Sequence, residues 1–166
     1  MSNTYYVTRR GLGLLAQKQK DLVEDLERST RAMGHSASLD NDLRENPEFM
    51  QLRTKVTYEL PSKIAELRSV MRLARLINDS EHIKNQDFHE VLPGVEVEME
   101  SEDGEIRVHS ILGYDEGDPQ QGIVSYLSPV GEELLHKAVG DEVVLPMQGK
   151  LIRYEIVTIK LSPHLG

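Results

Sequence analysis

Two carboxylates, Asp42 and Glu45, stand three positions apart in a stretch that is rich in turn-forming residues. Side chains at positions i and i+3 can face the same way in a helix or a turn, so this pair can present two carboxylates together. From the spacing alone, the segment could supply two carboxylates at one place, although a solvated turn without chemistry has the same composition.

Other metal and redox chemistries find little support in the sequence. The chain has no cysteine, so it can form neither a disulfide nor a thiolate metal site. Its six histidines show no paired spacing such as i, i+4. Structural zinc and disulfide bonds are therefore excluded.

The sequence on either side of the two carboxylates predicts a helical hairpin, which would position them. The first helix carries a seam with spacings typical of a two-stranded coiled coil, at Leu12, Leu15, Gln19, Leu22 and Leu26. The second seam comprises Phe49, Leu52, Val56, Leu60, Ile64, Leu67, Met71 and Ala74. Its phase shifts at Val56, Leu60 and Ile64, next to Pro61, which predicts a local bend.

The tip of this hairpin is predicted between the two seams. Residues 34–47 are poor in helix formers and rich in turn residues. Asn46 and Pro47 form a good N-cap and first helical residue, with Glu48 well placed at the positive helix end. If fully helical, the stretch from Gly11 to Asp42 is about 45 Å long. The arm is longer than a compact core requires.

After Asn85 the apolar period changes from helical to two, which predicts strands at 95–99, 106–108, 123–127, 143–145 and 151–161. Ser128 and Pro129 predict the start of one short helix, which packs on a twisted, mostly antiparallel sheet. The predicted class is α+β. An N-terminal antiparallel α-helical coiled-coil hairpin occupies residues 1–84, and a β-rich domain occupies residues 85–166.

The charge is unevenly distributed between these halves. Residues 1–84 carry 14 Lys and Arg against 12 Asp and Glu, whereas residues 85–166 carry 5 against 16. The acidic half repels phosphate backbones, so independent binding to duplex DNA is not expected. The apolar stretch from Leu12 to Ala16 is far too short for a membrane span, and we expect a cytoplasmic protein without a membrane partner.

Several motifs occur in an order that resembles a known family. The run Asn41-Asp42-Leu43-Arg44-Glu45-Asn46-Pro47-Glu48-Phe49 resembles the tip motif of the bacterial Gre transcription elongation factors. Thr8-Arg9-Arg10-Gly11 resembles the family's start, at the family's distance from the tip. Gly113-Tyr114-Asp115-Glu116 and the segment from Ser128-Pro129 to Val143 resemble its carboxy-terminal domain. The resemblance covers nearly the whole chain.

The resemblance implies an FKBP-like second domain that docks on bacterial RNA polymerase beside its secondary channel. The coiled coil then enters the channel and meets the nascent RNA 3′ end of a backtracked complex. It also implies that Asp42 holds the second Mg²⁺ of the polymerase and that Glu45 orients or deprotonates the attacking water. The factor would stimulate the nuclease activity of polymerase and not be an enzyme itself.

The remaining site residues follow from the same resemblance. Arg44 and Arg53 are candidates for contacts with RNA phosphate. Four residues in the matching motifs of the β-rich domain are candidates for polymerase binding: Asp115, Glu116, Ser128 and Pro129.

The sequence also departs from the family pattern, and three other functions stay open. Asn41, Pro47 and Phe49 replace the usual glycine, alanine and tyrosine, and residues 34–38 replace strong helix formers. These departures fit a regulator that enters the channel and inhibits or modulates transcription without strong cleavage. A proline isomerase or chaperone would need an aromatic-lined pocket, and residues 85–166 hold only four aromatic residues. A plain coiled-coil adaptor explains the hairpin but not its acidic tip.

Overall fold

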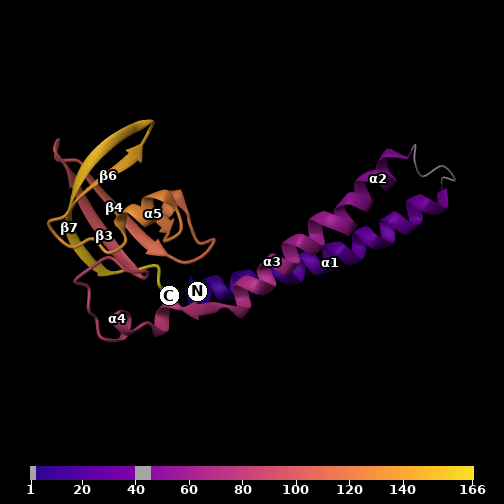
Figure 1. Cartoon of the computed structure of the whole chain (residues 1–166), viewed down its shortest axis with the longest axis horizontal. Helices are drawn as coiled ribbons and strands as arrows, with labels where there is room; N and C mark the ends of the chain where they lie inside the picture. Colours follow the sequence, from indigo (N-terminus) through magenta and orange to yellow (C-terminus); the bar gives the residue numbers. More distant parts are fainter. Residues whose placement is uncertain (1–2, 40–45) are drawn as a thin grey trace. The chain divides into compact units, whose positions relative to one another are not determined.

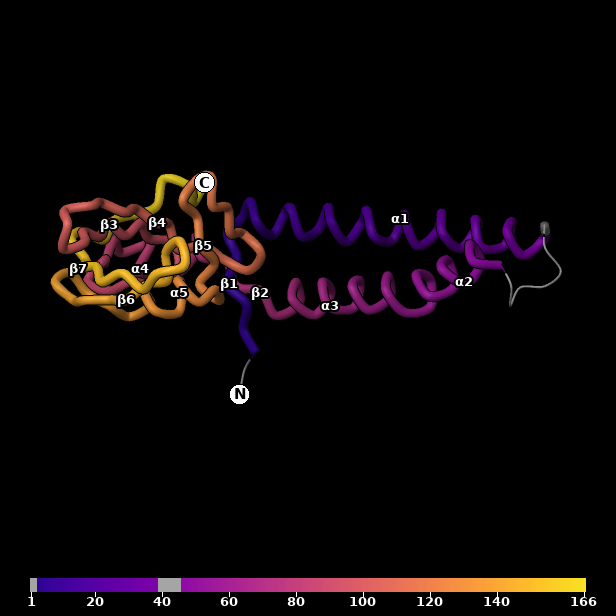
Figure 2. The backbone as a smooth tube through the Cα atoms, turned by 90° about the horizontal axis from the view of Figure 1, so that it is seen from above, coloured from indigo at the N-terminus to yellow at the C-terminus, as the bar shows by residue number. Residues whose placement is uncertain are grey.

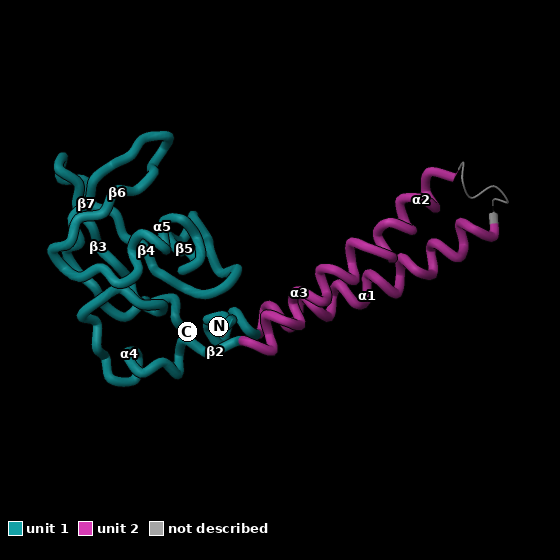
Figure 3. Tube along the Cα trace, viewed as in Figure 1, with its two compact units in different colours: residues 1–12, 74–166 teal, residues 13–73 magenta. Residues whose placement is uncertain are grey.

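The computed structural model describes residues 3–39 and 46–166, which form two compact units (Figure 3). Residues 13–73 make up the hairpin unit, and residues 1–12 with 74–166 make up the β-rich unit. Contacts thus divide the chain at residues 12 and 73. The domain boundary that the sequence analysis places at residue 84 stays a prediction.

The hairpin unit consists of two antiparallel helical runs, which Figure 2 shows side by side. The outgoing run is α1 (Arg9–Leu39), and the returning run is α2 (Pro47–Thr54), the π-helical segment η2 (Lys55–Glu59) and α3 (Leu60–Arg72). The prediction that residues 34–39 belong to the tip was wrong, because α1 continues through them. Tertiary contacts outweigh weak helix propensity there, as the burial of Ser36 illustrates.

The predicted phase shift coincides with the π-helical segment. η2 ends at Glu59 and α3 begins at Leu60, so the irregular turn overlaps the first part of the step formed by Val56, Leu60 and Ile64. A π turn admits one extra residue per turn, which accommodates a shift in the apolar phase. Pro61 has no N–H to donate, and it lies just after this segment, where the regular α-helical hydrogen-bond pattern of the run is already interrupted.

Apolar burial in the returning run of the hairpin is concentrated in α3. On the returning run, Leu60, Ile64, Leu67 and Val70 of α3 are buried. Neither α2 nor η2 contains a buried residue. The segment formed by α2 and η2, which we call the far part of the hairpin, therefore depends less on apolar packing than α3 does.

The β-rich unit is built on a five-stranded sheet in the order β5-β4-β3-β7-β6 (Figure 1). Its strands are β3 (Val95–Ser101), β4 (Ile106–Leu112), β5 (Ile123–Ser125), β6 (Glu142–Met147) and β7 (Lys150–Leu161). All neighbouring pairs are antiparallel except β4 with β5. The prediction of a mostly antiparallel sheet is confirmed, and so is the α+β class.

One face of this sheet carries the main core. The alternation of Val95, Val97 and Met99 with glutamates puts the three apolar side chains on the buried face of β3. They pack with Leu134 of α5 (Pro129–Leu134) and with Tyr154 of β7. The predicted helix start is confirmed, because Ser128 is the N-cap and its Oγ accepts a hydrogen bond from the Gly131 N–H at 3.1 Å.

A small second sheet was not anticipated. β1 (Tyr5–Val7) pairs in parallel with β2 (Ala74–Leu76), so the second helical run ends at Arg72 and does not continue through Ala74. Short helices η3 (Ile77–Asp79) and α4 (Glu81–Lys84) follow, and η4 (Pro119–Gln121) precedes β5. Val7 and Ile77 are fully buried in this region.

Among the described residues, no helix combines the length and the apolar character that crossing a membrane would require.

Candidate functional site

The predicted reactive residues fall in the segment between the two helical runs. Asp42, Arg44 and Glu45 lie outside the described residues. The structure does describe what precedes and follows them, since α1 ends at Leu39 and α2 begins at Pro47. Arg53, the second candidate for RNA contact, is exposed in the last turn of α2. The assigned roles of these four residues stay predictions.

The start of α2 is fixed by its N-cap. The Asn46 Oδ1 accepts a hydrogen bond from the Phe49 N–H at 3.1 Å, and Pro47 occupies the first turn. This confirms the predicted helix start. The Asn46 Nδ2 donates to the Ser36 Oγ of α1 at 3.0 Å, which the sequence did not reveal. One side chain therefore caps the returning run and joins it to the outgoing run.

A second polar link joins the two runs at the π-helical segment. The Lys55 Nζ lies 3.0 Å from the Asp25 Oδ1, and the Ser29 hydroxyl donates to the same oxygen at 3.2 Å. The hydrogen bond from Lys55 is the main cause that lowers the pKa of the Asp25 carboxyl below its ordinary value. Arg28 contributes a weaker ion pair, with its Nη2 3.7 Å from Asp25. These polar groups help to hold the hairpin together where apolar burial is sparse.

The candidates for polymerase binding in the β-rich unit divide into two kinds. Glu116 is used internally: its carboxylate accepts hydrogen bonds from the Thr8 N–H at 2.9 Å, from the Thr8 hydroxyl and from the Gly113 N–H at 3.0 Å. Ser128 is used internally as well, as the N-cap of α5. Asp115 and Pro129 are exposed. Of the four, these two have the more accessible side chains for a partner.

The Glu116 contacts also explain the start of α1. The Thr8 Oγ1 accepts a hydrogen bond from the Gly11 N–H at 2.9 Å, so Thr8 caps the helix while Glu116 holds Thr8. A Cβ at Gly11 would lie 2.5–2.8 Å from the Glu116 carboxylate, closer than atoms pack. The motif that begins with Thr8 and the one that ends with Glu116 are thus two sides of one structural contact. Nothing in the sequence analysis predicted that these two motifs meet.

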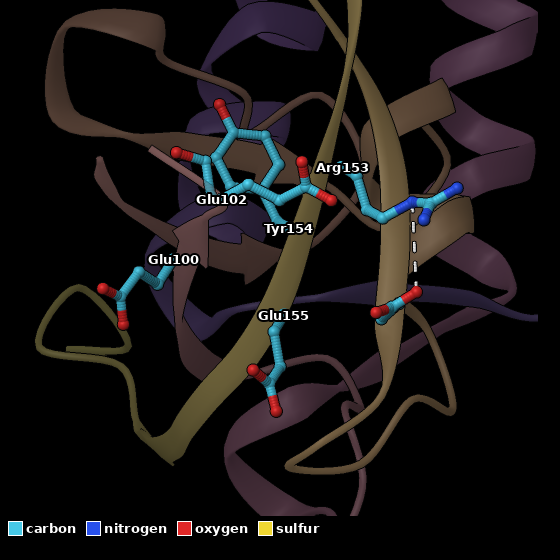
Figure 4. A pocket seen from close by; sticks show the side chains of 7 residues that line it. Glu100, Glu102, Arg153, Tyr154 and Glu155 are labelled. Atoms are coloured by element: carbon cyan, nitrogen blue, oxygen red, sulfur yellow. Dashed lines mark ion pairs between the residues drawn. The ribbon is translucent and has the colours of Figure 1, made fainter. Parts of the chain in front are cut away.

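The outer side of the sheet carries an acidic row. Glu100 of β3 and Glu142 of β6 both lie directly opposite Glu155 of β7. They line a hollow of about 130 Å³ together with Glu102 and Arg153. In Figure 4 the carboxylates of Glu100 and Glu155 point in different directions. The Arg153 Nε lies 3.9 Å from the Glu142 Oε2, as an ion pair. Consistently, no group of three or more potential ligands for a metal occurs in the part of the chain that the structure describes.

Comparisons with known proteins identify relatives for most of the chain. Residues 85–161 match the family model described as "Transcription elongation factor, GreA/GreB, C-term". The chain is 35% identical over 130 residues to transcription elongation factor GreA of Desulfovibrio desulfuricans, covering 76% of this chain and 77% of that protein. It is 30% identical over 160 residues to GreA of Chlorobium phaeobacteroides, covering 96% and 98%.

Two solved structures are also similar to the chain. One is titled "Structure of the transcription factor Gfh1", with 19% identity, a TM-score of 0.45, and coverage of 96% of this chain and 99% of that one. The other is the elongation factor GreA/GreB from Nitrosomonas europaea, with 23% identity, a TM-score of 0.42, and coverage of 67% and 88%.

Proposed function

The chain belongs to the GreA/GreB family of transcription elongation factors, and we propose that it stimulates RNA polymerase to cleave backtracked RNA. In this proposal the hairpin enters the secondary channel of a bacterial polymerase, and its tip brings Asp42 and Glu45 to the RNA 3′ end. The β-rich unit supplies most of the affinity for polymerase, because it offers a rigid surface.

One observation supports this proposal above the others: the two carboxylates stand between two helical runs that the structure describes up to Leu39 and from Pro47. α1 has 31 residues, which corresponds to about 45 Å of helix. A hairpin of this length can carry a short acidic segment into a narrow channel.

The donor chemistry fits a magnesium ion that is shared with a partner. Asp42 and Glu45 are oxygen ligands, and Mg²⁺ often takes only one or two protein carboxylates. A second Mg²⁺ would supply the stabilisation of charge that phosphodiester hydrolysis needs. In the proposal Asp42 contributes negative charge toward the cation, Glu45 orients the attacking water or accepts its proton, and Arg44 and Arg53 attract RNA phosphate.

The same reasoning predicts that the purified chain has no nuclease activity. Two carboxylates do not complete the ligand set of a two-metal site. RNA hydrolysis by the purified protein without polymerase would contradict this division of labour.

The decisive test is the rate of RNA cleavage in a stalled, backtracked elongation complex at saturating factor. Asp42→Asn nearly preserves shape and removes the charge, so the rate should fall about 10²–10³-fold while polymerase binding persists. Glu45→Gln should have a comparable or smaller effect. Glu48→Gln is the matched control, because Glu48 is an exposed acid in the first turn of α2 and should leave the rate nearly unchanged.

Two outcomes would replace the proposal. Equal rates for wild type and Asp42→Asn across a Mg²⁺ titration would rule out the role of the carboxylate. Slower nucleotide addition by wild type, without any cleavage, would instead support a channel regulator that inhibits or modulates transcription.

A further inference from the structure

We propose that Ser36 and Asn46 are positioning residues for the tip: their hydrogen bond holds together the two ends of the segment that carries Asp42 and Glu45. This inference rests on the proposed function for its effect on cleavage. The hydrogen bond itself, which we call the tip clasp, can be tested without any cleavage assay.

The clasp uses both polar atoms of the Asn46 side-chain amide. The Asn46 Oδ1 accepts from the Phe49 N–H at 3.1 Å, and its Nδ2 donates to the Ser36 Oγ at 3.0 Å. The first contact fixes the side chain relative to α2, and the second fixes it relative to α1. An Asn at this position thereby sets the start of the returning helix and its attachment to the outgoing helix together.

The surroundings of Ser36 make this contact stronger than an exposed one. Ser36 is only 3% exposed, so its hydroxyl has little access to water. A buried hydroxyl without a partner is unfavourable, which favours the paired state. Since α2 buries no residue of its own, apolar packing gives this end of the hairpin little support. The clasp therefore adds a fixed attachment where no residue of α2 is fully buried.

The clasp lies at the place where small displacements matter most for the proposed chemistry. Ser36 and Asn46 are ten positions apart and enclose the acidic pair in sequence. Tying the ends of a segment reduces the number of conformations that it can adopt. A misplacement of about 1 Å can slow a positioned reaction by about 10²-fold. Loss of the clasp should therefore reduce the rate of cleavage more than the binding of polymerase.

Ser38 provides a matched control. Its hydroxyl donates to the His35 carbonyl oxygen of its own helix at 2.7 Å, and it is exposed. Ser36→Ala and Ser38→Ala remove the same atom from the same helix. Alanine favours a helix more than serine does, so neither change should reduce the helicity of α1. Only Ser36→Ala breaks the clasp.

The first measurement is amide hydrogen exchange of Phe49 and Met50 in the full chain without polymerase. A net hydrogen bond of ordinary strength changes a local equilibrium about two- to tenfold, so Ser36→Ala should accelerate exchange by that factor. Asn46→Ser keeps a capping oxygen but removes the amide donor, and should do the same. Ser38→Ala should match wild type. Equal exchange in Ser36→Ala and Ser38→Ala would overturn the clasp.

The second measurement is the cleavage rate against factor concentration. Ser36→Ala should lower the rate at saturation about three- to tenfold and leave the half-saturating concentration unchanged, and Ser36→Thr, which keeps a hydroxyl, should restore much of the rate. A changed half-saturating concentration with an unchanged saturated rate would contradict positioning. Absence of cleavage in wild type would reject the proposed function, while the exchange experiment would still decide whether the clasp exists.

Discussion

In the β-rich unit Met99, Leu134 and Tyr154 are completely buried in one core, whereas α2 at the far part of the hairpin contains no buried residue. The first region has its elements fixed by apolar packing from several directions. The second has polar links, namely Asn46 with Ser36 and Lys55 with Asp25. Buried apolar area contributes most of the stability of folded proteins, so the far hairpin should open locally more readily than the sheet.

This difference matches the two tasks in the proposed function. A surface that binds a large partner benefits from a fixed shape, because less ordering is needed on binding. A slender arm that enters a channel must expose most of its side chains to the surroundings. Polar links such as the tip clasp can fix the backbone at chosen points of such an arm.

Core truncation should give the largest difference between the two regions. Leu134→Ala should lower the free energy of unfolding of the β-rich unit by about 2–5 kcal/mol, because it leaves a cavity in a fully buried site. Leu52→Ala in α2 removes the same atoms from a half-buried site and should cost about 1 kcal/mol or less.

Urea unfolding with separate probes can check this contrast. Five of the six tyrosines lie in the β-rich unit and only Tyr58 lies in the hairpin, so tyrosine fluorescence reports mainly on the first. Circular dichroism at a helix band reports mainly on the second. Equal losses for the two variants would show that the far hairpin is packed as tightly as the sheet.

An intermediate effect is expected from a change at Glu116. Its side chain makes polar contacts within the β-rich unit, as the polar links do within the hairpin. Glu116→Gln removes the charge that accepts hydrogen bonds from Thr8 and Gly113, and should lower stability by about 1.5–3 kcal/mol. Glu133→Gln, on the exposed side of α5, is the control and should change stability by about 0.5 kcal/mol or less. Thermal unfolding of both variants measures the difference. If Glu116→Gln matched its control, the carboxylate would be free to serve a partner.

The sequence predicted those elements whose pattern is local. The alternation around Val97, the caps at Ser128 and Asn46, and the phase shift near Pro61 each involve neighbouring residues, and the structure places a strand, two helix starts and a π-helical turn there. Patterns of this kind depend on the chain's own periodicity and capping chemistry.

What the sequence did not predict depends on distant contacts. Glu116 and Thr8 are 108 positions apart, and neither residue indicates its partner. β1 and β2 have three residues each, and Ala74 also continued the helical period. The sequence pattern therefore did not indicate this parallel pair of strands. The weak helix formers at residues 34–39 are helical because other residues hold them, as Ser36 shows. The chemical roles of Asp42, Arg44 and Glu45 stay predictions.

The smallest expected effect is a difference in the pH at which each region loses stability. Burial, and secondarily the charge of Arg107, lowers the pKa of His109 on β4 below its ordinary value of 6.5, while the backbone of Gly122 opposes the shift. The unfolded chain then binds more protons than the folded one as the pH falls below 6.5, so the β-rich unit should become less stable from that point downward. In the hairpin the lowered pKa of Asp25 gives stability that is present above the ordinary value of 3.8 and is lost only as the pH falls further.

The measurement is the urea midpoint of each unit between pH 7.5 and 4.5, with the two probes described above. The contribution of His109 is the difference between wild type and His109→Gln, which cannot titrate. The comparison with His109→Gln is needed because His89 acts in the opposite direction. Pairing with Asp87 raises the pKa of His89, so His89 contributes stability as the pH falls. This contribution is weak, because the pair is largely exposed. His89→Gln should accordingly steepen the loss, and His109→Gln should flatten it. A hairpin midpoint that falls as early as that of the sheet would mean that the two regions unfold as one cooperative unit, and the contrast between them would have to be abandoned.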